Sequence, residues 1–191
     1  MVNIDYLKNP FNYIGGKYKL LPQILPLFPK KIDKFVDLFG GGGEVSLNVN
    51  AKQVVYNDKC KPLVNIFRNL DSKFVDEVKE MIDTYKLNKF SKQEFLNLRS
   101  YYNTNLKDKL DRENAVVLYC LITHAFNYQI AFNKNREFNM PSGASRSYFS
   151  KSLEDKLVKY IEAIDKKNIS FYSSDFHNLN LDSPEFNNTF Y

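Results

Sequence analysis

The seven glycines of this 191-residue chain occur at only three places, Gly15–Gly16, Gly40–Gly43 and Gly143. Glycine costs stability unless the backbone needs a positive φ or must approach a ligand closely, so this confinement favours a role in binding. The four-glycine run follows the β-type segment 35–39 and precedes 44–47, which can open a helix. A strand, a glycine turn and a helix present backbone N–H groups to a nucleotide at the carboxyl end of a strand.

The residues around this run narrow the kind of nucleotide. A P-loop needs Lys and Ser/Thr where Glu44 and Val45 stand, and a dinucleotide fingerprint needs a small residue in place of Val45. Glu44 also puts a carboxylate where a pyrophosphate would bind. A second β-type run, 54–58, ends in Asp58, at the position of the usual ribose-binding acid. The pair predicts a nucleoside without phosphates, of which S-adenosyl-L-methionine is the common cofactor; the alternative is a tight turn beside a solvated carboxylate.

Composition sets wide bounds on function. The formal charge of +5 allows a polyanionic partner without demanding one. Cys60 and Cys120 match neither a metal-binding spacing nor a disulfide framework, and His124 and His177 are isolated, so we expect no metal site and a reducing cytoplasm. The N-terminus lacks the pattern of a signal peptide, and no apolar run approaches the roughly 20 residues of a membrane span. No membrane partner is expected.

The remaining pattern predicts a sheet interrupted by helices. A helix, a strand, a helix, a second strand and a short helix are expected in the first part, at 17–27, 35–39, from 44, 53–57 and 61–70. Helices then follow, one capped by Ser91 with Glu94 three residues on, and one over 114–126 that is apolar all round and should be buried. After a polar loop come a helix capped by Ser152, a strand at 169–173 and the start of a fourth strand at 188–191.

Five sequence motifs together resemble a known family. They are Tyr-Ile-Gly-Gly-Lys at 13–17, Asp-Leu-Phe-Gly-Gly-Gly-Gly at 37–43, Asn-Asp at 57–58, Ser-Asp-Phe at 174–176, and the paired segments 126–133 and 137–143. Their order and spacing are similar to those of the Dam-type DNA adenine-N6 methyltransferases, in the branch found in restriction-modification systems. The resemblance covers essentially the whole chain. It implies an α/β fold, with a Rossmann-like sheet that binds S-adenosyl-L-methionine and a helical DNA-recognition insertion.

The resemblance also implies domain limits and a cofactor site. Residues 1–71 and 151–191 would belong to the methyltransferase sheet, incomplete at its C-terminus, and 72–150 to the recognition insertion. Asp58 would hold the ribose hydroxyls, and Asp175 with Phe176 would contact the adenine ring of the cofactor. The complete set implied for the cofactor is Tyr13, Lys17, Asp37, Phe39, Gly40, Gly41, Asp58, Asp175 and Phe176.

The segment 126–151 resembles the family's target-recognition region. Basic side chains suit phosphates, Asn and Gln suit adenine edges, and aromatic rings can stack on bases or wedge between them. The residues expected to contact double-stranded DNA are Asn127, Gln129, Asn133, Lys134, Arg136, Asn139 and Arg146. Ala131 departs from the pattern, since Arg is expected there, which puts the target sequence in doubt. The alternative is an ordinary polar surface loop.

One expected element is missing. Enzymes of this family flip the target adenine out of the duplex and hold its amine with an Asp-Pro-Pro-Tyr tetrapeptide. No such tetrapeptide occurs here, and in the family it follows a strand like 189–191 almost at once. We therefore expect a truncated or split bacterial or phage enzyme, inactive alone and completed by a second polypeptide or a C-terminal fragment. The alternative is a non-catalytic relative that binds the cofactor or DNA as a regulatory module.

Overall fold

The computed structural model describes residues 5–179 and 189–191, and its centre is a parallel sheet. The strand order is β3-β2-β1-β4, and β1 pairs in parallel with β2 and β4, as β2 does with β3. The strands are β1 (Lys34–Asp37), β2 (Gln53–Asn57), β3 (Ile169–Tyr172) and β4 (Thr189–Phe190). Because β2 and β3 lie on one side of β1 and β4 on the other, the order reverses at β1. In doubly wound sheets, ligands bind at such a reversal, beyond the carboxyl ends of the strands.

The sequence located these strands well. The strand expected at 53–57 is confirmed at both ends, and the fourth strand is confirmed by its pairing of Phe190 with Phe35. The first strand ends at Asp37, two residues earlier than expected, because the chain turns there into the glycine run. The helix expected over 17–27 consists of three short consecutive pieces: Tyr18–Leu20, α1 (Leu21–Ile24) and Leu25–Leu27.

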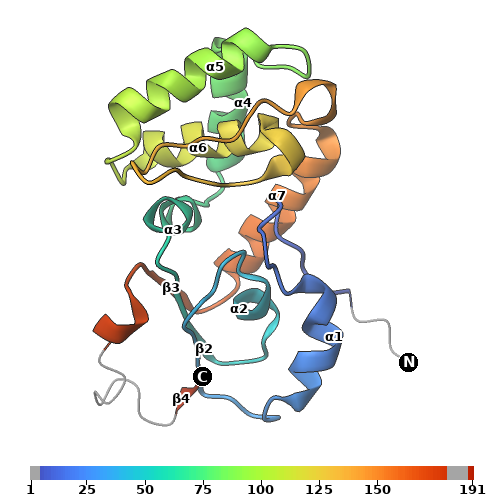
Figure 1. Ribbon diagram of the computed structural model, residues 1–191. Coiled ribbons are helices and arrows are strands. Elements are labelled where there is room, and N and C mark those ends of the chain that lie inside the picture. The colour runs from blue at the N-terminus through green and yellow to red at the C-terminus, as the bar shows by residue number, and fades with distance from the viewer. Residues whose placement is uncertain (1–4, 180–188) are drawn as a thin grey trace.

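The helices between β2 and β3 form a second layer above the sheet (Figure 1). Between β2 and β3 the chain makes α3 (Lys61–Arg68), α4 (Phe74–Thr84), α5 (Lys92–Tyr101), α6 (Arg112–His124) and α7 (Lys151–Asp165); α2 (Glu44–Asn48) follows β1. A π-helical turn, Tyr102–Leu106, extends α5. In Figure 1, α4, α5 and α6 lie together at the top, and α7 runs from this layer down to the sheet. None of the described helices is both long enough and apolar enough to span a bilayer.

Two expected caps are wrong in detail. Ser91 precedes α5, but its Oγ accepts from the Asn88 N–H (2.6 Å) and donates to the Asn88 carbonyl (2.7 Å), so it does not cap the helix. Helix α7 is capped by Ser150, not Ser152, and the Ser150 Oγ accepts from the Leu153 N–H at 3.3 Å. The Ser91 hydroxyl bonds the backbone of the preceding turn instead of the helix, and α7 begins at Lys151, so that Ser152 lies inside it. Sequence spacing alone reveals neither outcome.

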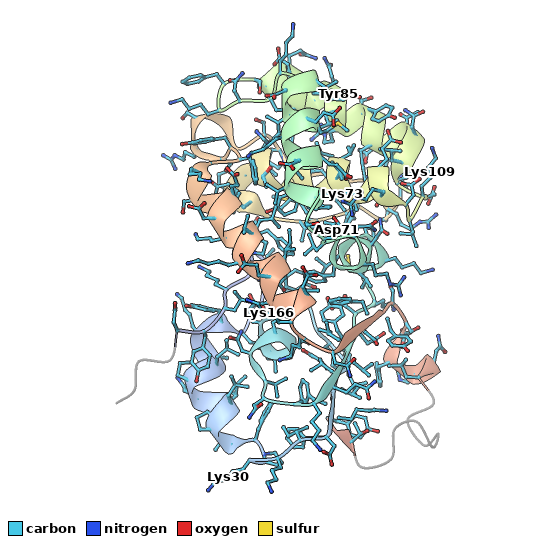
Figure 2. The ribbon with its side chains drawn as sticks, turned by 180° about the vertical axis from the view of Figure 1, so that it is seen from behind. Lys30, Asp71, Lys73, Tyr85, Lys109 and Lys166 are labelled. Atoms are coloured by element: carbon cyan, nitrogen blue, oxygen red, sulfur yellow. The ribbon has the colours of Figure 1, made fainter. Side chains whose placement is uncertain are left out.

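One large apolar cluster joins the sheet to the helical layer. Every residue of α6 from Asn114 to His124 is buried, which confirms the expected buried helix. Below it, the Phe67 ring of α3 stacks against three rings from other segments, with centroids 6.0 Å from Phe11, 5.9 Å from Tyr160 and 5.7 Å from Phe171. Figure 2 shows side chains filling the space between the two layers. This packing fixes α7 and the N-terminal segment over the carboxyl ends of the strands.

Candidate functional site

The turn after β1 has a conformation that only glycine adopts easily. Gly41 and Gly43 have φ of +48° and +77°, in the left-handed region. Gly40 lacks a positive φ, but a Cβ there would lie 2.2 Å from the Tyr56 ring. The run is therefore required both by backbone conformation and by the close approach of β2.

Side chains from two elements, β2 and α7, hold this turn. The Tyr56 hydroxyl donates to the Gly41 carbonyl (2.7 Å), and the Tyr160 hydroxyl of α7 donates to the Gly42 carbonyl (2.8 Å). Burial raises the pKa of both phenols well above its ordinary value, so both stay neutral donors. Neither was expected from the sequence. For Tyr56 the only signal was the glycine run itself, because glycine is favoured where a neighbouring group lies very close. Tyr160 belonged to the apolar face expected for its helix, and this pattern does not indicate a hydrogen bond to the glycine turn.

Asp58 lies directly against the glycine turn. One carboxylate oxygen accepts from the Gly41 N–H (2.9 Å) and the other from the Cys60 N–H (2.8 Å). These bonds fix the carboxylate at the carboxyl end of β2, and each oxygen keeps a lone pair for a further donor. Burial raises the pKa of the neighbouring Cys60 to about 11, so that side chain is a neutral thiol.

Asn57 joins the ends of three strands. Its buried amide donates to the carbonyls of Leu38 and Ser174, both at 3.1 Å, and accepts from the Ser174 N–H at 3.0 Å. The segment after β3 is thereby held beside the segment after β1. The cofactor residues expected from separate motifs meet at this edge of the sheet.

Asp175 and Phe176 follow β3 at the same edge. Asp175 contacts His177 Nδ1 (2.8 Å) and Lys59 Nζ (3.0 Å), and these two contacts lower its pKa below the ordinary value. The Phe176 ring meets the Phe39 ring edge to face, with centroids 5.3 Å apart. Phe39 is 69% exposed and Phe176 38% exposed, so this aromatic pair presents open faces at the mouth of the site.

The N-terminal segment closes the other side of the turn. The Tyr13 ring packs on Gly41, where an added Cβ would lie 2.7 Å from Tyr13 Cε1. Burial, and next the charge of Asp58, raise the Tyr13 pKa to about 12, so its phenol is neutral near pH 7. Lys17 is exposed, and its Nζ donates to the Gly15 carbonyl at 2.6 Å.

Carboxylates gather around the glycine turn. Asp37 accepts from the Ser46 hydroxyl at 2.7 Å, and Glu44, at the start of α2, accepts from the Asn9 amide. Burial is the main cause that raises the pKa of both carboxyls. Together with Asp58 they make a site that favours a cationic ligand and disfavours a phosphate. Within residues 5–179 and 189–191, no group of three or more His, Cys, Asp and Glu side chains is arranged to hold a metal ion.

The loop expected to contact DNA is fixed to the helical layer from behind. The Asn103 amide, in the π-helical turn, makes both backbone hydrogen bonds of Phe138, donating to its carbonyl (3.0 Å) and accepting from its N–H (2.8 Å). Arg99 Nη1 donates to the Met140 carbonyl at 2.9 Å. Neither contact was expected from the sequence, because each joins residues about 40 positions apart.

The residues expected to contact DNA divide into two groups along this loop. Asn133 accepts from the Asn135 and Glu137 N–H groups and so shapes the turn that carries Lys134 and Arg136. Arg136 forms an ion pair with Asp108 at 2.8 Å, whereas Lys134 and Asn139 are exposed. The second group lies near the N-terminal segment and consists of Asn127, Gln129 and Arg146. The Asn12 N–H of that segment donates to the Tyr128 carbonyl at 3.1 Å and so joins the two.

The family model of the D12 class N6 adenine-specific DNA methyltransferases matches residues 13–191. The chain belongs to this family. The match runs from Tyr13 to Tyr191 and so covers the glycine turn, Asp58 and the loop expected to contact DNA. The parallel sheet with its order reversal at β1 agrees with the Rossmann-like fold of such enzymes.

Curated relatives of this chain are DNA methylases, and two of them, M.FokI and StsI, are methylases of type II restriction-modification systems. Type II methyltransferase M.FokI of Planomicrobium okeanokoites is 44% identical over 98% of the chain, and modification methylase StsI of Streptococcus sanguinis is 41% identical over 95%. The DNA adenine methylase of Haemophilus influenzae is 26% identical over 73% of the chain and 49% of its own length. The chain spans only 28% of the length of M.FokI and of StsI.

Proposed function

We propose that these 191 residues form the cofactor-binding and DNA-binding parts of a restriction-modification methyltransferase that methylates N6 of adenine in duplex DNA. The observation that carries the proposal is the Asp58 carboxylate, fixed to the Gly41 amide at 2.9 Å where the strand order reverses. Membership in the D12 family supports the reaction and the DNA substrate.

The charged groups around the glycine turn suit S-adenosyl-L-methionine. Its sulfonium and ammonium groups are cations, which suits the carboxylates of Asp37, Glu44 and Asp58 around the turn, and it has no phosphate for Glu44 to repel. When bound, the cofactor supplies a methyl group on a positively charged sulfur. Asp58 would accept hydrogen bonds from the ribose hydroxyls, and the exposed Phe39 and Phe176 rings would cover the adenine.

The remaining cofactor residues would position the methionine part. Tyr13 packs on the turn as a neutral phenol, Lys17 reaches over the Gly15 carbonyl, and the Gly40–Gly41 backbone leaves room for close approach. In the recognition loop, Asn127, Gln129, Asn133 and Asn139 would meet base edges, whereas Lys134, Arg136 and Arg146 would meet phosphates. We further propose that a polypeptide of these 191 residues alone binds the cofactor and DNA but does not methylate the DNA, because it contains no Asp-Pro-Pro-Tyr.

The proposal is tested by calorimetric titration of S-adenosyl-L-methionine into the wild type and the variant Asp58→Ala. Loss of charge-assisted bonds to the ribose should weaken binding by about tenfold to a hundredfold. Asp58→Asn, which retains an oxygen for the Gly41 N–H, separates loss of the charge from loss of the turn. Asp33→Ala is the matched control, because Asp33 is an exposed acid next to the opposite end of β1.

A wild-type chain that binds duplex DNA but gives no heat with the cofactor would contradict the enzyme assignment and favour a non-catalytic DNA-binding module. Equal cofactor affinity of Asp58→Ala, Asp58→Asn and Asp33→Ala would remove Asp58 from the site. Turnover by the 191-residue polypeptide alone, with tritiated cofactor and mixed-sequence DNA, would refute the need for a second polypeptide.

A further inference from the structure

A cavity of about 530 Å³ lies outside the cofactor site, where the N-terminal segment meets the recognition loop and α7. Its walls come from residues 8–12, from 127–128 with 146–147, and from Ser150, Ser152, Leu153 and Lys156 at the start of α7. Figure 1 shows the segment before α1 rising beside α7, so residues far apart in the sequence meet in the wall of the cavity. Lys8 and Lys156, which both line it, are neither among the residues expected to bind the cofactor nor among those expected to contact DNA.

The lining of this cavity is cationic. Lys8, Arg146 and Lys156 come from three separate segments, and the described residues of the lining include no Asp or Glu. Glu44 accepts from the amide of Asn9, which is one of the lining residues. Asn and Ser side chains supply neutral hydrogen-bonding groups around the three cations. Such a set suits an anion whose oxygens only accept hydrogen bonds, as those of a phosphodiester do.

These three cations also differ from the other basic residues nearby. Arg136 is paired with Asp108, and Lys151 with Glu154 and Asp155. Within the described part of the chain, Lys8, Arg146 and Lys156 make no ion pair with a carboxylate; Lys8 lies over the Tyr18 ring, 5.5 Å from its centroid. No acid among the described residues therefore neutralises their charge.

The wall of the cavity is held in an uncommon conformation. Asn127 and Tyr128 both have positive φ, +54° and +57°, although neither is glycine. The Tyr128 hydroxyl donates to the Arg146 carbonyl at 3.2 Å, and its own carbonyl accepts from the Asn12 N–H at 3.1 Å. These bonds hold the two sides of the recognition loop against the N-terminal segment, and backbone held in such regions clusters at ligand sites.

We propose that this cavity binds a phosphate of the DNA backbone through Lys8, Lys156 and Arg146. The inference rests on the proposed function, because Asn127 and Arg146 belong both to the cavity and to the surface expected to meet DNA. It extends that surface beyond the recognition loop to the N-terminal segment and to α7. A phosphate contact carries no sequence information, but it would set the position of the duplex relative to the loop.

The test compares two double variants of the chain that lose equal charge. Lys8→Ala/Lys156→Ala removes two cations of the cavity, and Lys30→Ala/Lys166→Ala removes two elsewhere. Figure 2 shows Lys30 at the lower end of the molecule and Lys166 at the sheet end of α7; Lys166 lies ten residues beyond Lys156, roughly 15 Å along a helix. Duplex-DNA affinity is measured by fluorescence anisotropy at several salt concentrations.

Each phosphate contact contributes about −0.9 to the slope of log affinity against log salt concentration. The cavity variant should therefore lose about 0.9 of this slope and bind about fivefold more weakly at 0.15 M salt, whereas the control variant keeps the wild-type slope. Affinity for S-adenosyl-L-methionine should be unchanged in both. Equal slopes for the two double variants would overturn the proposal.

Two further outcomes separate this inference from the proposed function. If the wild-type chain binds the cofactor but no duplex DNA, both the DNA substrate of the proposed function and the phosphate site are refuted. If the wild type binds DNA and the cavity variant binds it with the same affinity and salt slope, only the phosphate site is refuted. Titration with inorganic phosphate at constant ionic strength tests a free anion as the source. If phosphate binds the wild type and not the cavity variant while their DNA slopes are equal, the cavity holds a free anion and the proposal is overturned.

Discussion

The glycine turn after β1 and the recognition loop 126–150 are fixed by different means. In the turn, buried hydroxyls of Tyr56 and Tyr160 satisfy carbonyl groups, and neighbouring rings leave no space for a Cβ at Gly40. The loop is held instead at a few backbone points, by Asn103 and by Asn12, while most of its polar side chains stay exposed. A rigid turn suits a cofactor of constant shape. The loop is anchored through its backbone and through the buried Ile130 and Phe138 side chains, and it leaves exposed most of the polar side chains that are expected to contact DNA.

The largest expected effect is a loss of stability on substituting glycine, and two glycines separate its causes: steric overlap at Gly40 and a positive φ at Gly15. Gly40→Ala places a Cβ 2.2 Å from the buried Tyr56 ring and should lower the free energy of unfolding by about 3 kcal/mol. Gly15→Ala meets no atom within 4 Å, so only its φ of +83° opposes the change, at about 1 kcal/mol. Urea denaturation of both variants measures the difference. Equal losses would show that the turn yields to accommodate a side chain.

A smaller loss of stability is expected on removing one tyrosine hydroxyl that bonds the glycine turn, and a still smaller one on removing a hydroxyl in the recognition loop. Tyr160→Phe leaves the buried Gly42 carbonyl without its donor and should cost about 2 kcal/mol of unfolding free energy. Tyr128→Phe removes an exposed bond to the Arg146 carbonyl, for which water substitutes, and should change stability by less than about 0.5 kcal/mol. Thermal and urea unfolding of the pair checks this. If Tyr128→Phe cost as much as Tyr160→Phe, the loop would be as rigidly built as the turn.

The two regions also differ in how far the sequence predicted them. The glycine run, the strand at 53–57 that precedes Asp58 and the buried helix α6 follow from local patterns, and the structure has the turn, the strand and the helix there. The supports were not predictable, because Tyr160 reaches Gly42 across 118 positions and Ser91 bonds Asn88 instead of capping its helix. Positive φ at Asn127 and Tyr128 had no glycine to mark it. The roles assigned to the cofactor and DNA residues stay predictions.

The smallest expected effect concerns the support of the loop. Asn103→Ala removes both bonds to the Phe138 backbone and should weaken duplex-DNA binding by about tenfold, or about 1.4 kcal/mol, because the loop then loses one of its anchors. Cofactor affinity should stay unchanged, since the glycine turn has separate supports. Anisotropy and calorimetry of the same samples measure the two affinities.

Asn105→Ala is the matched control, because Asn105 is exposed in the same π-helical turn and bonds only the Tyr101 carbonyl. Asn103→Asp tests the geometry of the contact, since it keeps an acceptor for the Phe138 N–H but cannot donate to the Phe138 carbonyl. Intermediate DNA affinity for Asn103→Asp would mean that the loop is positioned by both bonds. If all three variants bound DNA like the wild type, the recognition loop would hold its shape without the helical layer, and the contrast with the glycine turn would disappear.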